Sequence, residues 1–530
     1  MFALIGNVNT LAAERRIATE GPPETVAQKG EALVVMAQER FGVALSAAER
    51  KMLEGAPDRM IPWVGPDTDP NNPANDAGRG DKWGPDRTIR AELLKWLCTD
   101  PAALQYVHES GPSLAAARIA GKLDLSYLRG PKPITLLRCY APDGFDISYA
   151  QLTSFEVKRS KVGPINGDMV TSAGDVAFMR GSYGPVSLFR ARIGNNLNFS
   201  GGNFVAGAAE AAVSLVDANI AGDVLFLEGF KTDGFVDMRL AKVGDSVTFK
   251  NVQFVGGGDN GLNAERVAIE GTLYWFSVAV TARTVLDLEN ASAGALWDDS
   301  SSWPAKGNLV IDGFAYNDFS GGPSDAAGRL KWLALQPVGY HPRPYRRVAK
   351  VLRDDGREAE ANTVEIAKEV EHRRFGEMSL LERAWNLLLQ ATIGYGFRPL
   401  RALWWIIGFV LLGTALFAWG YSAKVMTPTD ETAYREFMKS GLTPPHYPPF
   451  NPLVYSLENF LPVVDLYQGS YWRPNPRDLP GGELHLGSLT SDARTFPGAM
   501  LRGYLWIHIL AGWILTPLLF AGLSGLVRIE

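Results

Sequence analysis

Two long stretches without a charged residue, both near the C-terminal end, constrain this chain more than any other feature. They cover Ala402–Ala423 and Gly503–Val527, which are 22 and 25 residues long. As helices they would be about 33 and about 37 Å long, enough to cross the hydrocarbon core of a bilayer. Trp and Tyr lie near their ends, as expected at a lipid–water boundary. We predict that both stretches cross a membrane, because the alternative, a pair of buried helices in a soluble protein, is seldom so long without a charge.

The rest of the chain indicates which membrane is crossed and in which orientation. The first residues contain too short an apolar run for a secretory signal. Two cysteines, Cys98 and Cys139, are too few for a disulfide framework and fit a reducing compartment. Arg398 and Arg401 precede the first stretch, and such basic residues favour the cytoplasmic side. We expect an inner (plasma) membrane protein with cytoplasmic N- and C-termini and an outer loop at 424–502.

A recurring phrase between residues 113 and 320 predicts a stack of similar coils. An aliphatic residue starts each copy, glycine or a short polar run follows, and alternating apolar positions come next, in copies that begin at Ile119, Ile193, Ile220, Val243 and Ile269. The last four copies are 27, 23 and 26 residues apart, a period that is typical of solenoids. We predict a β-helix (β-solenoid) with apolar side chains inside and polar ones outside; a β-sandwich is the alternative.

The repeating units resemble those of pentapeptide-repeat and related β-helix proteins, although they are longer and less regular. Coils with polar outer surfaces usually serve as spacers or binding surfaces. We therefore expect the β-helix to be a cytoplasmic part that binds another protein or a ligand.

Helical segments flank the predicted β-helix, so the expected fold class is mixed. Region 1–112 is predicted to be helical around a Pro/Asn/Asp/Gly linker at 61–86. Region 330–401 is predicted to form a helical hairpin and a connector helix, which starts at a capping box at Ser379. This connector should lie along the inner membrane face or under a channel mouth. Residues 402–527 complete the chain as the membrane domain.

The membrane domain resembles the two-span potassium-type ion channels in the order of its segments. Between the two apolar stretches, Pro452–Leu466 is a candidate for a re-entrant segment, and Tyr455–Pro462 stands where such channels keep a pore helix. The resemblance implies a homo-oligomer, expected to be a tetramer, because a subunit with two spans cannot enclose a pore alone. An ordinary two-span anchor with packing glycines is the alternative.

Two sets of residues are the candidates for ion passage. The position of a filter is occupied by residues that depart from the potassium signature: Pro462, Val463, Val464, Asp465 and Leu466. A ring of Asp465 carboxylates there would favour cations, and Glu458 is a further candidate for the pore side. Both acidic residues have a simpler interpretation as solvated side chains. Inner-helix hinges are expected at Gly512, Pro517 and Gly522, since proline removes a helical hydrogen bond. His508, in the same helix, is expected to snorkel or to form a hydrogen bond.

A filter-like string, Thr392–Phe397, precedes the first apolar stretch instead of following it. A potassium filter lies between two spans at the outer mouth, so this position is wrong for one. We predict that its glycines form a cap and a turn after the connector helix.

No catalytic constellation is visible in the sequence. The six histidines have no metal-ligand spacing, and Gly256-x-Gly258-x-x-Gly261 matches the dinucleotide spacing without the long helix that should follow. The net charge of −5, with scattered basic residues, suggests no nucleic-acid partner. We expect no enzyme activity, no cofactor and no metal.

Taken whole, the chain is similar to a bacterial family often labelled membrane-associated oxidoreductase. That resemblance implies redox chemistry, for which the sequence offers no site. Our main hypothesis is a cation channel gated through its cytoplasmic β-helix. A non-conducting membrane scaffold or sensor that recruits a partner, and an enzyme, remain the alternatives.

Overall fold

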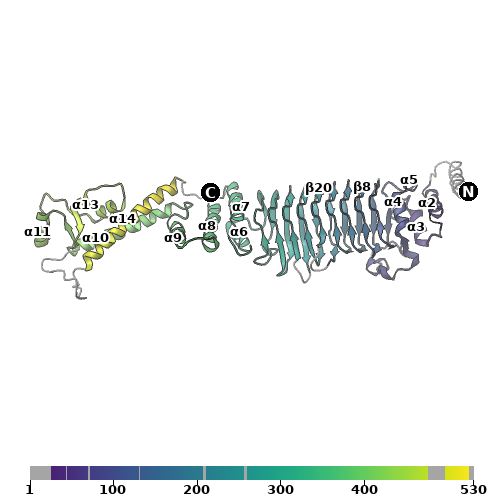
Figure 1. Ribbon diagram of the computed structural model, residues 1–530, viewed down its shortest axis with the longest axis horizontal. Helices are drawn as coiled ribbons and strands as arrows, with labels where there is room; N and C mark the ends of the chain where they lie inside the picture. Colours follow the sequence, from purple (N-terminus) through teal and green to yellow (C-terminus); the bar gives the residue numbers. More distant parts are fainter. Residues whose placement is uncertain are drawn as a thin grey trace. The chain divides into compact units, whose positions relative to one another are not determined.

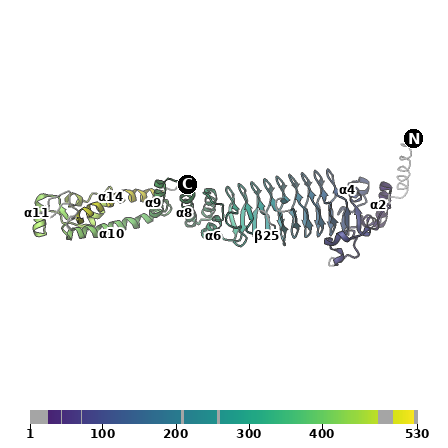
Figure 2. The same cartoon turned by 60° about the horizontal axis from the view of Figure 1, so that its bottom comes forward.

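The computed structural model describes residues 25–42, 44–69, 72–130, 132–206, 211–255, 260–475 and 496–524. The chain divides into two compact units, unit 1 (Met1–Val364) and unit 2 (Glu365–Glu530). Figures 1 and 2 show that unit 1 is built mainly of short stacked strands, whereas unit 2 is mainly helical.

Unit 1 begins with short helices: α2 (Val26–Phe41), α3 (Ala47–Gly55), α4 (Ala91–Thr99) and α5 (Pro101–Leu104). Capping boxes start the first two, with Thr25 and Ser46 as the N-caps. The predicted linker contains three 3₁₀ turns, η1 (Pro73–Asn75), η2 (Ala77–Lys82) and η3 (Pro85–Arg87). After them, β1 (Thr88–Arg90) pairs in parallel with β3 (Arg118–Ala120), so this segment joins the first coil of the solenoid.

A parallel β-solenoid follows, and its strands form three sheets that run along the stack. One nine-stranded sheet fixes about nine turns among the described residues: β4 (Leu123–Asp124), β7 (Phe145–Asp146), β11 (Ile165–Asn166), β15 (Val186–Ser187), β19 (Ala211–Ser214), β23 (Phe235–Asp237), β26 (Asn260–Asn263), β29 (Thr284–Asp287) and β31 (Leu309–Val310). The six-stranded sheet contains β8 (Gln151–Leu152), β12 (Thr171–Ser172), β16 (Arg192–Ile193), β20 (Asn219–Ile220), β24 (Lys242–Val243) and β27 (Ala268–Ile269).

The third sheet has 17 strands in two rows, which the long strands β25 and β28 join. Besides β1 and β3 it contains β2 (Ser113–Ala115), β5 (Ile134–Leu137), β6 (Tyr140–Ala141), β9 (Phe155–Lys158), β10 (Lys161–Val162), β13 (Val176–Met179), β14 (Ser182–Tyr183), β17 (Leu197–Asn198), β18 (Asn203–Phe204), β21 (Val224–Phe226), β22 (Lys231–Thr232), β25 (Val247–Phe254), β28 (Thr272–Ala279), β30 (Ala295–Asp298) and β32 (Asp318–Gly321).

Each coil buries side chains at alternating intervals of two and three residues. In one coil the buried positions are Phe145, Ile147, Ala150, Leu152, Phe155, Val157, Ser160 and Val162. Identical positions of neighbouring coils stack on one another, and the best example is a row of aromatic rings: Phe178, Phe199, Phe226, Phe249 and Trp275. Each such ring contributes roughly 1.5–3 kcal/mol of burial, and neighbouring rings add about 0.5–1.5 kcal/mol per pair.

The solenoid prediction is confirmed, and the β-sandwich alternative is wrong because the strand pairs of all three sheets are parallel. The copies that begin at Ile193, Ile220, Val243 and Ile269 stack in register in the six-stranded sheet. The copy at Ile119 lies on another side of the coil, where it pairs with β1. The same two-and-three spacing recurs on every side, so the phrase alone does not identify the side.

Helices close the far end of unit 1: α6 (Ala326–Leu333), α7 (Pro342–Asp354) and the start of α8 (Glu358–Phe375). Arg329 of α6 is fully buried and makes a bidentate ion pair with Asp298 of β30, at 2.8 and 3.0 Å. The guanidinium also lies 3.9 Å above the ring of Phe319. This pairing leaves neither charge unmatched where α6 covers the last coils.

Unit 2 contains the end of α8 and five further helices of nine or more residues: α9 (Leu380–Thr392), α10 (Leu400–Ser422), α11 (Glu431–Ser440), α12 (Pro452–Phe460) and α14 (Phe496–Leu523). The short helix α13 (Gln468–Tyr471) leads into β34 (Trp472–Pro474), which pairs antiparallel with β33 (Met426–Pro428). Both predicted apolar stretches are helices, α10 and α14, long and apolar enough to cross a membrane.

Candidate functional site

The candidate site is the place where α12 packs against both α10 and α14, called here the three-helix junction. Asn451 caps α12, because its side-chain oxygen accepts from the N–H groups of Leu453 and Val454 at 3.1 and 3.2 Å. Pro462 follows the helix and disfavours helical geometry at Leu461, which is extended. The sequence of the loop between the two long helices therefore specifies a short helix with a defined start and a defined end.

Contacts along α10 show how far α12 reaches. Near its start, Tyr455 packs edge-to-face on Phe417, with ring centroids 4.9 Å apart. At its end, Phe460 belongs to a buried cluster with Ile406, Val410 and Leu515. Seven to eleven residues of α10 separate these two levels, which corresponds to roughly 10–16 Å of helix. The helix α12 thus runs from the Ser422 end of α10 to the middle of both long helices.

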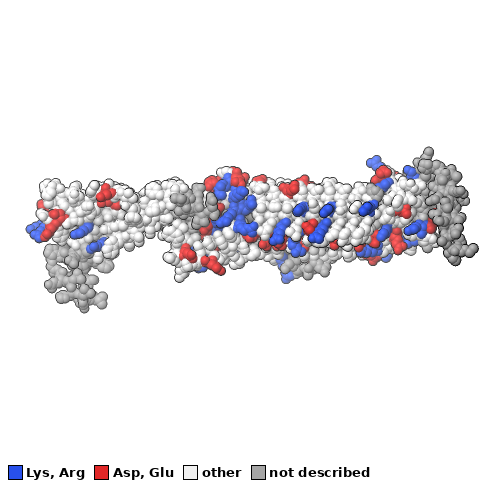
Figure 3. Space-filling model, turned by 45° about the horizontal axis from the view of Figure 1, so that its top comes forward, with Lys and Arg blue, Asp and Glu red and all other residues white. Residues whose placement is uncertain are grey.

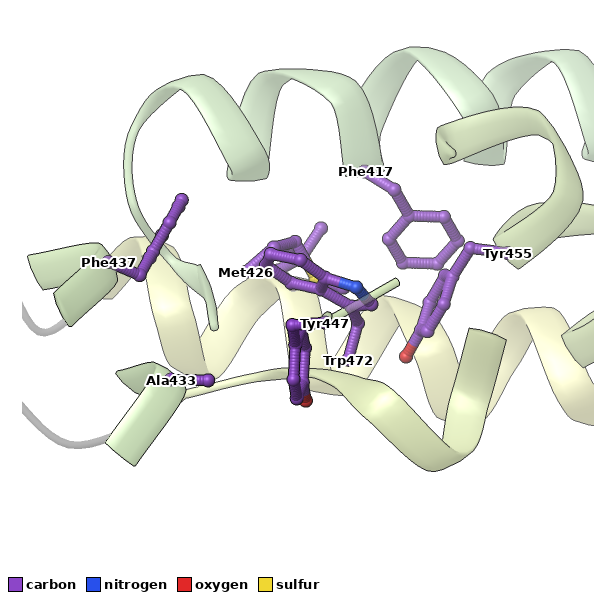
Figure 4. Packing of buried hydrophobic residues seen from close by; sticks show 8 residues of the cluster. Phe417, Met426, Ala433, Phe437, Tyr447, Tyr455 and Trp472 are labelled. Atoms are coloured by element: carbon purple, nitrogen blue, oxygen red, sulfur yellow. The ribbon is translucent and has the colours of Figure 1, made fainter. Parts of the chain in front are cut away.

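The chain then returns to its starting level through α13 and β34. There an aromatic cluster holds the loop together, as Figure 4 shows with Tyr455 of α12 facing Phe417 of α10; its buried members are Phe417, Met426, Ala433, Phe437, Tyr447, Tyr455, Trp472 and Leu501. The indole N–H of Trp472 donates to the carbonyl of Pro448 at 3.1 Å. One end of α12 is therefore anchored in a packed cluster at the Ser422 end of α10.

Two glycines let α12 approach the backbones of the long helices. A Cβ atom on Gly512 of α14 would lie 1.8 Å from the carbonyl oxygen of Phe460. A Cβ atom on Gly413 of α10 would lie 2.4 Å from Oγ of Ser456 and 2.8 Å from Cε1 of His508. No side chain other than hydrogen fits at Gly512 without a backbone shift, so the position of α12 depends on that residue.

A buried polar network joins the three helices at the same level. Oγ of Ser456 donates to the carbonyl of Val410 at 2.8 Å. Nε2 of His508 lies 2.9 Å from the carbonyl oxygen of Ser456 and therefore donates to it. Nδ1 of the same ring then accepts, and the hydroxyl of Tyr504 lies 3.2 Å away. His508 and Ser456 are fully buried, so these bonds replace water that neither residue can reach.

The five candidate filter residues, Pro462–Leu466, form the loop that follows α12. Pro462 is partly exposed and the next four residues are exposed, with Val463 at 93%. Asp465 accepts from the N–H of Tyr467 at 2.9 Å, and no ion pair to it is found among the described residues. The structure thus presents a mostly apolar loop with one carboxylate on the surface of the described chain.

Glu458 lies beside the returning chain. Its carboxylate accepts from the N–H groups of Gln468 and Gly469, at 2.7 and 3.1 Å. These are the first N–H groups of α13, and a carboxylate at this position also interacts favourably with the helix dipole. Glu458 therefore fixes the end of the loop at the start of α13. Its sequence position alone did not indicate these contacts.

The three hinge candidates occupy different surroundings. Gly512 is the close-contact glycine of the junction. Gly522 packs near the start of α10, since a Cβ there would lie 2.9 Å from Cβ of Pro399. Pro517 is exposed inside a continuous α14, where it leaves the carbonyl of Trp513 without its helical donor. Sequence reasoning missed Gly413 and Ser456, although a glycine and a serine in apolar helices are signals of close packing.

The filter-like string Thr392–Phe397 is a turn between α9 and α10, as predicted. Gly394, Tyr395 and Gly396 all have positive φ angles, of 55°, 57° and 85°. The buried hydroxyl of Tyr395 donates to Oδ1 of Asn386 at 2.8 Å, and Arg373 donates to both. This network ties the last turn of α8 and the middle of α9 to the turn that leads into α10.

Other candidate chemistry finds little support in the described part of the chain. No group of three or more His, Cys, Asp or Glu residues that could hold a metal ion is found there. Burial raises the pKa of both thiols, Cys98 and Cys139, to about 12, so neither is a reactive thiolate. Of the glycine motif, Gly256 and Gly258 lie outside the described residues, and Gly261 lies in β26.

Charge is unevenly distributed. Figure 3 shows Lys and Arg gathered over α7, where the exposed residues of one helix face are Arg343, Arg346, Lys350 and Arg353. The surface over the middle of α10 and α14 in the same view carries no charged side chains.

Comparisons with known protein families, with curated proteins and with solved structures find no match to this chain. The three family resemblances noted in the sequence therefore stay predictions.

Proposed function

We propose that the protein is an oligomeric membrane channel that conducts cations through an opening lined by the loop Pro462–Leu466. The observation that carries this proposal is the path of the chain around α12. It enters between two long apolar helices, reaches their middle and returns on the same side. In this proposal Pro452–Trp472 is a re-entrant segment, with α12 as its pore helix.

The surfaces of α10 and α14 support a location in lipid. Only 28% and 22% of their most apolar windows are buried within the protein. A core helix of a soluble protein would be mostly covered. Large apolar side chains instead point outward, among them Trp404, Leu411, Trp506, Leu510, Trp513 and Phe520. Such a surface is stable in lipid and unfavourable in water.

The charges around the loop support cations as the conducted species. The C-terminal end of α12, which carries the negative end of the helix dipole, lies at mid-depth of the two spans. Glu458 and Asp465 lie beside and within the loop, and no basic partner for either is found in the described residues. Several copies around one axis would place their Asp465 carboxylates in a ring, with four copies expected from the resemblance to two-span channels.

One observation favours the alternative of a scaffold. The exposed basic face of α7 in unit 1 suits an acidic partner. A solenoid that recruits such a partner would need the membrane helices only as an anchor. It would conduct no ions, and changes at Asp465 would leave its function intact.

Ion flux into liposomes decides between the two. The full chain is reconstituted, its oligomeric state is checked, and cation entry is followed with a fluorescent indicator. We expect flux that Asp465→Asn reduces or makes less selective for cations over anions. Glu436→Gln, a change at an exposed acid of α11, is the matched control and should leave the flux unchanged. An intact oligomer without any flux would reject the channel proposal in favour of the scaffold.

A further inference from the structure

The helix α9, which precedes the first span, exposes apolar side chains that nothing else in unit 2 covers among the described residues. Leu380 is 85% exposed and Leu381 80%, and Leu387 and Trp385 are 56% and 51% exposed. Four large apolar residues with this exposure on one helix of 13 residues are costly in water.

The exposed residues share one face of the helix. At 100° per residue, an arc of about 160° contains seven apolar positions and one polar one, Thr392. The apolar positions are Leu387, Leu380, Ala391, Ala384, Leu388, Leu381 and Trp385. The polar side chains Glu382, Asn386, Gln390 and Arg383 fill the opposite sector. Asn386 faces the protein, where it binds Arg373 and Tyr395. The apolar arc thus points away from the polar network that fixes the helix.

Contacts with the first span place this arc next to surfaces that face lipid. The carbonyl of Ala391 accepts from the indole N–H of Trp405 at 3.1 Å. Leu389 and Ile393 pack with Ala402 and Leu518 of the two spans. Next to them, Leu403 and Trp404 of α10 are exposed apolar side chains. Arg398 and Arg401, at the end of α10 where α9 lies, are exposed and suit the level of lipid headgroups.

We propose that α9 lies in the plane of the membrane interface, with its apolar arc in the boundary between headgroups and acyl chains of the bilayer that α10 and α14 cross. A helix of this kind buries its apolar face about 5–10 Å into this boundary. The bilayer is the occupant that fits, because the arc continues the lipid-facing surface of α10. Its one polar member, Thr392, is buried and donates its hydroxyl to the carbonyl of Leu388 at 2.7 Å, so the exposed part of the arc offers no polar group for a protein contact. The proposal requires that the spans cross a membrane, and it is independent of ion conduction.

Spin labels on engineered cysteines test this location in the reconstituted full chain. The native thiols are buried and unreactive, so a label reports the chosen site. Ala384→Cys lies near the centre of the arc, Leu381→Cys lies toward one side of it, and Arg383→Cys, on the polar sector, is the matched control. Collision with oxygen measures access from lipid, and collision with a water-soluble nickel chelate measures access from water.

At positions 384 and 381 we expect oxygen access to exceed nickel access several-fold, with the reverse at 383. Strong nickel access at 384 would place the arc in water and overturn the proposal. Exclusion of both reagents there would show a protein contact, with another part of this chain or a second copy, and would overturn it as well. Because the labels report depth and not flux, failure here is distinguishable from failure of the channel proposal.

Discussion

The solenoid of unit 1 makes one kind of contact many times, whereas the three-helix junction of unit 2 makes each of its contacts once. In the solenoid, the ring of Phe226 lies between those of Phe199 and Phe249, at centroid distances of 5.1 and 4.4 Å, and similar pairs repeat along the stack. In the junction, one glycine, Gly512, packs against the carbonyl of Phe460, and one histidine, His508, joins α12 to α14 by a hydrogen bond to the backbone. The difference predicts that damage stays local in unit 1 and spreads to the whole site in unit 2.

The largest loss of stability is expected from Phe226→Ala in the solenoid. The ring is fully buried, and its removal leaves a cavity that should cost about 3–5 kcal/mol. Hydrogen exchange should show lost protection in the coils next to β21 and little change elsewhere, because each coil contacts only its neighbours. Phe226→Leu, which keeps most of the volume, is the control. Loss of protection through all of unit 1 would contradict the idea that damage stays local.

A smaller loss of stability, with a larger effect on the site, is expected from Gly512→Ala. The added Cβ would overlap the carbonyl of Phe460, and such overpacking typically costs about 1–3 kcal/mol. We expect α12 to be displaced and liposome flux to fall at least tenfold. Gly408→Ala in α10 is the matched control, since nothing lies within 4 Å of a Cβ there. Equal flux in the two variants would show that the site does not depend on this contact.

Repetition also explains which parts of the structure the sequence revealed. The period of 27, 23 and 26 residues was visible because Ile193, Ile220, Val243 and Ile269 occupy one stacked row. The long apolar helices were equally plain, since length and missing charge suffice to predict them. The close contact at Gly512 had no such signal. A glycine in an apolar helix fits a hinge as well as a close contact, and only the position of Phe460 distinguishes them.

Long-range contacts of this kind account for the other differences. Glu458 looked like a residue for a pore or for water, but its partners are N–H groups ten and eleven residues further along. His508 was expected near the surface or in a hydrogen bond, and its partner Ser456 lies on another helix. No local pattern encodes such pairs, so composition and spacing could place these residues in helices without predicting what they contact.

A moderate loss of stability is expected from His508→Phe. The ring volume stays, but the bond to the carbonyl of Ser456 is lost, and a buried hydrogen bond of this kind contributes about 0.5–1.5 kcal/mol. Thermal unfolding in detergent, followed by circular dichroism, should show a Tm lower by a few degrees. Ile507→Phe, at an exposed neighbouring position of α14, should leave Tm unchanged. If both variants unfold at the same temperature as the parent protein, the network contributes little to the junction.

The smallest expected effect is on the pH dependence of stability, and it comes from Asp124 in the solenoid. Hydrogen bonds from Ser126, together with Lys95, lower the pKa of Asp124 to about 2. Since the pKa of an unfolded aspartate is about 3.9, the ionised carboxylate stabilises the fold above that pH, and this stabilisation is lost as pH falls toward 2. The side chain is 48% exposed, so solvent screening should keep the contribution below about 1 kcal/mol. Asp124→Asn should lower Tm slightly at pH 6 and match the parent protein near pH 2. A difference of equal size at both pH values would assign the effect of this substitution to packing instead of charge.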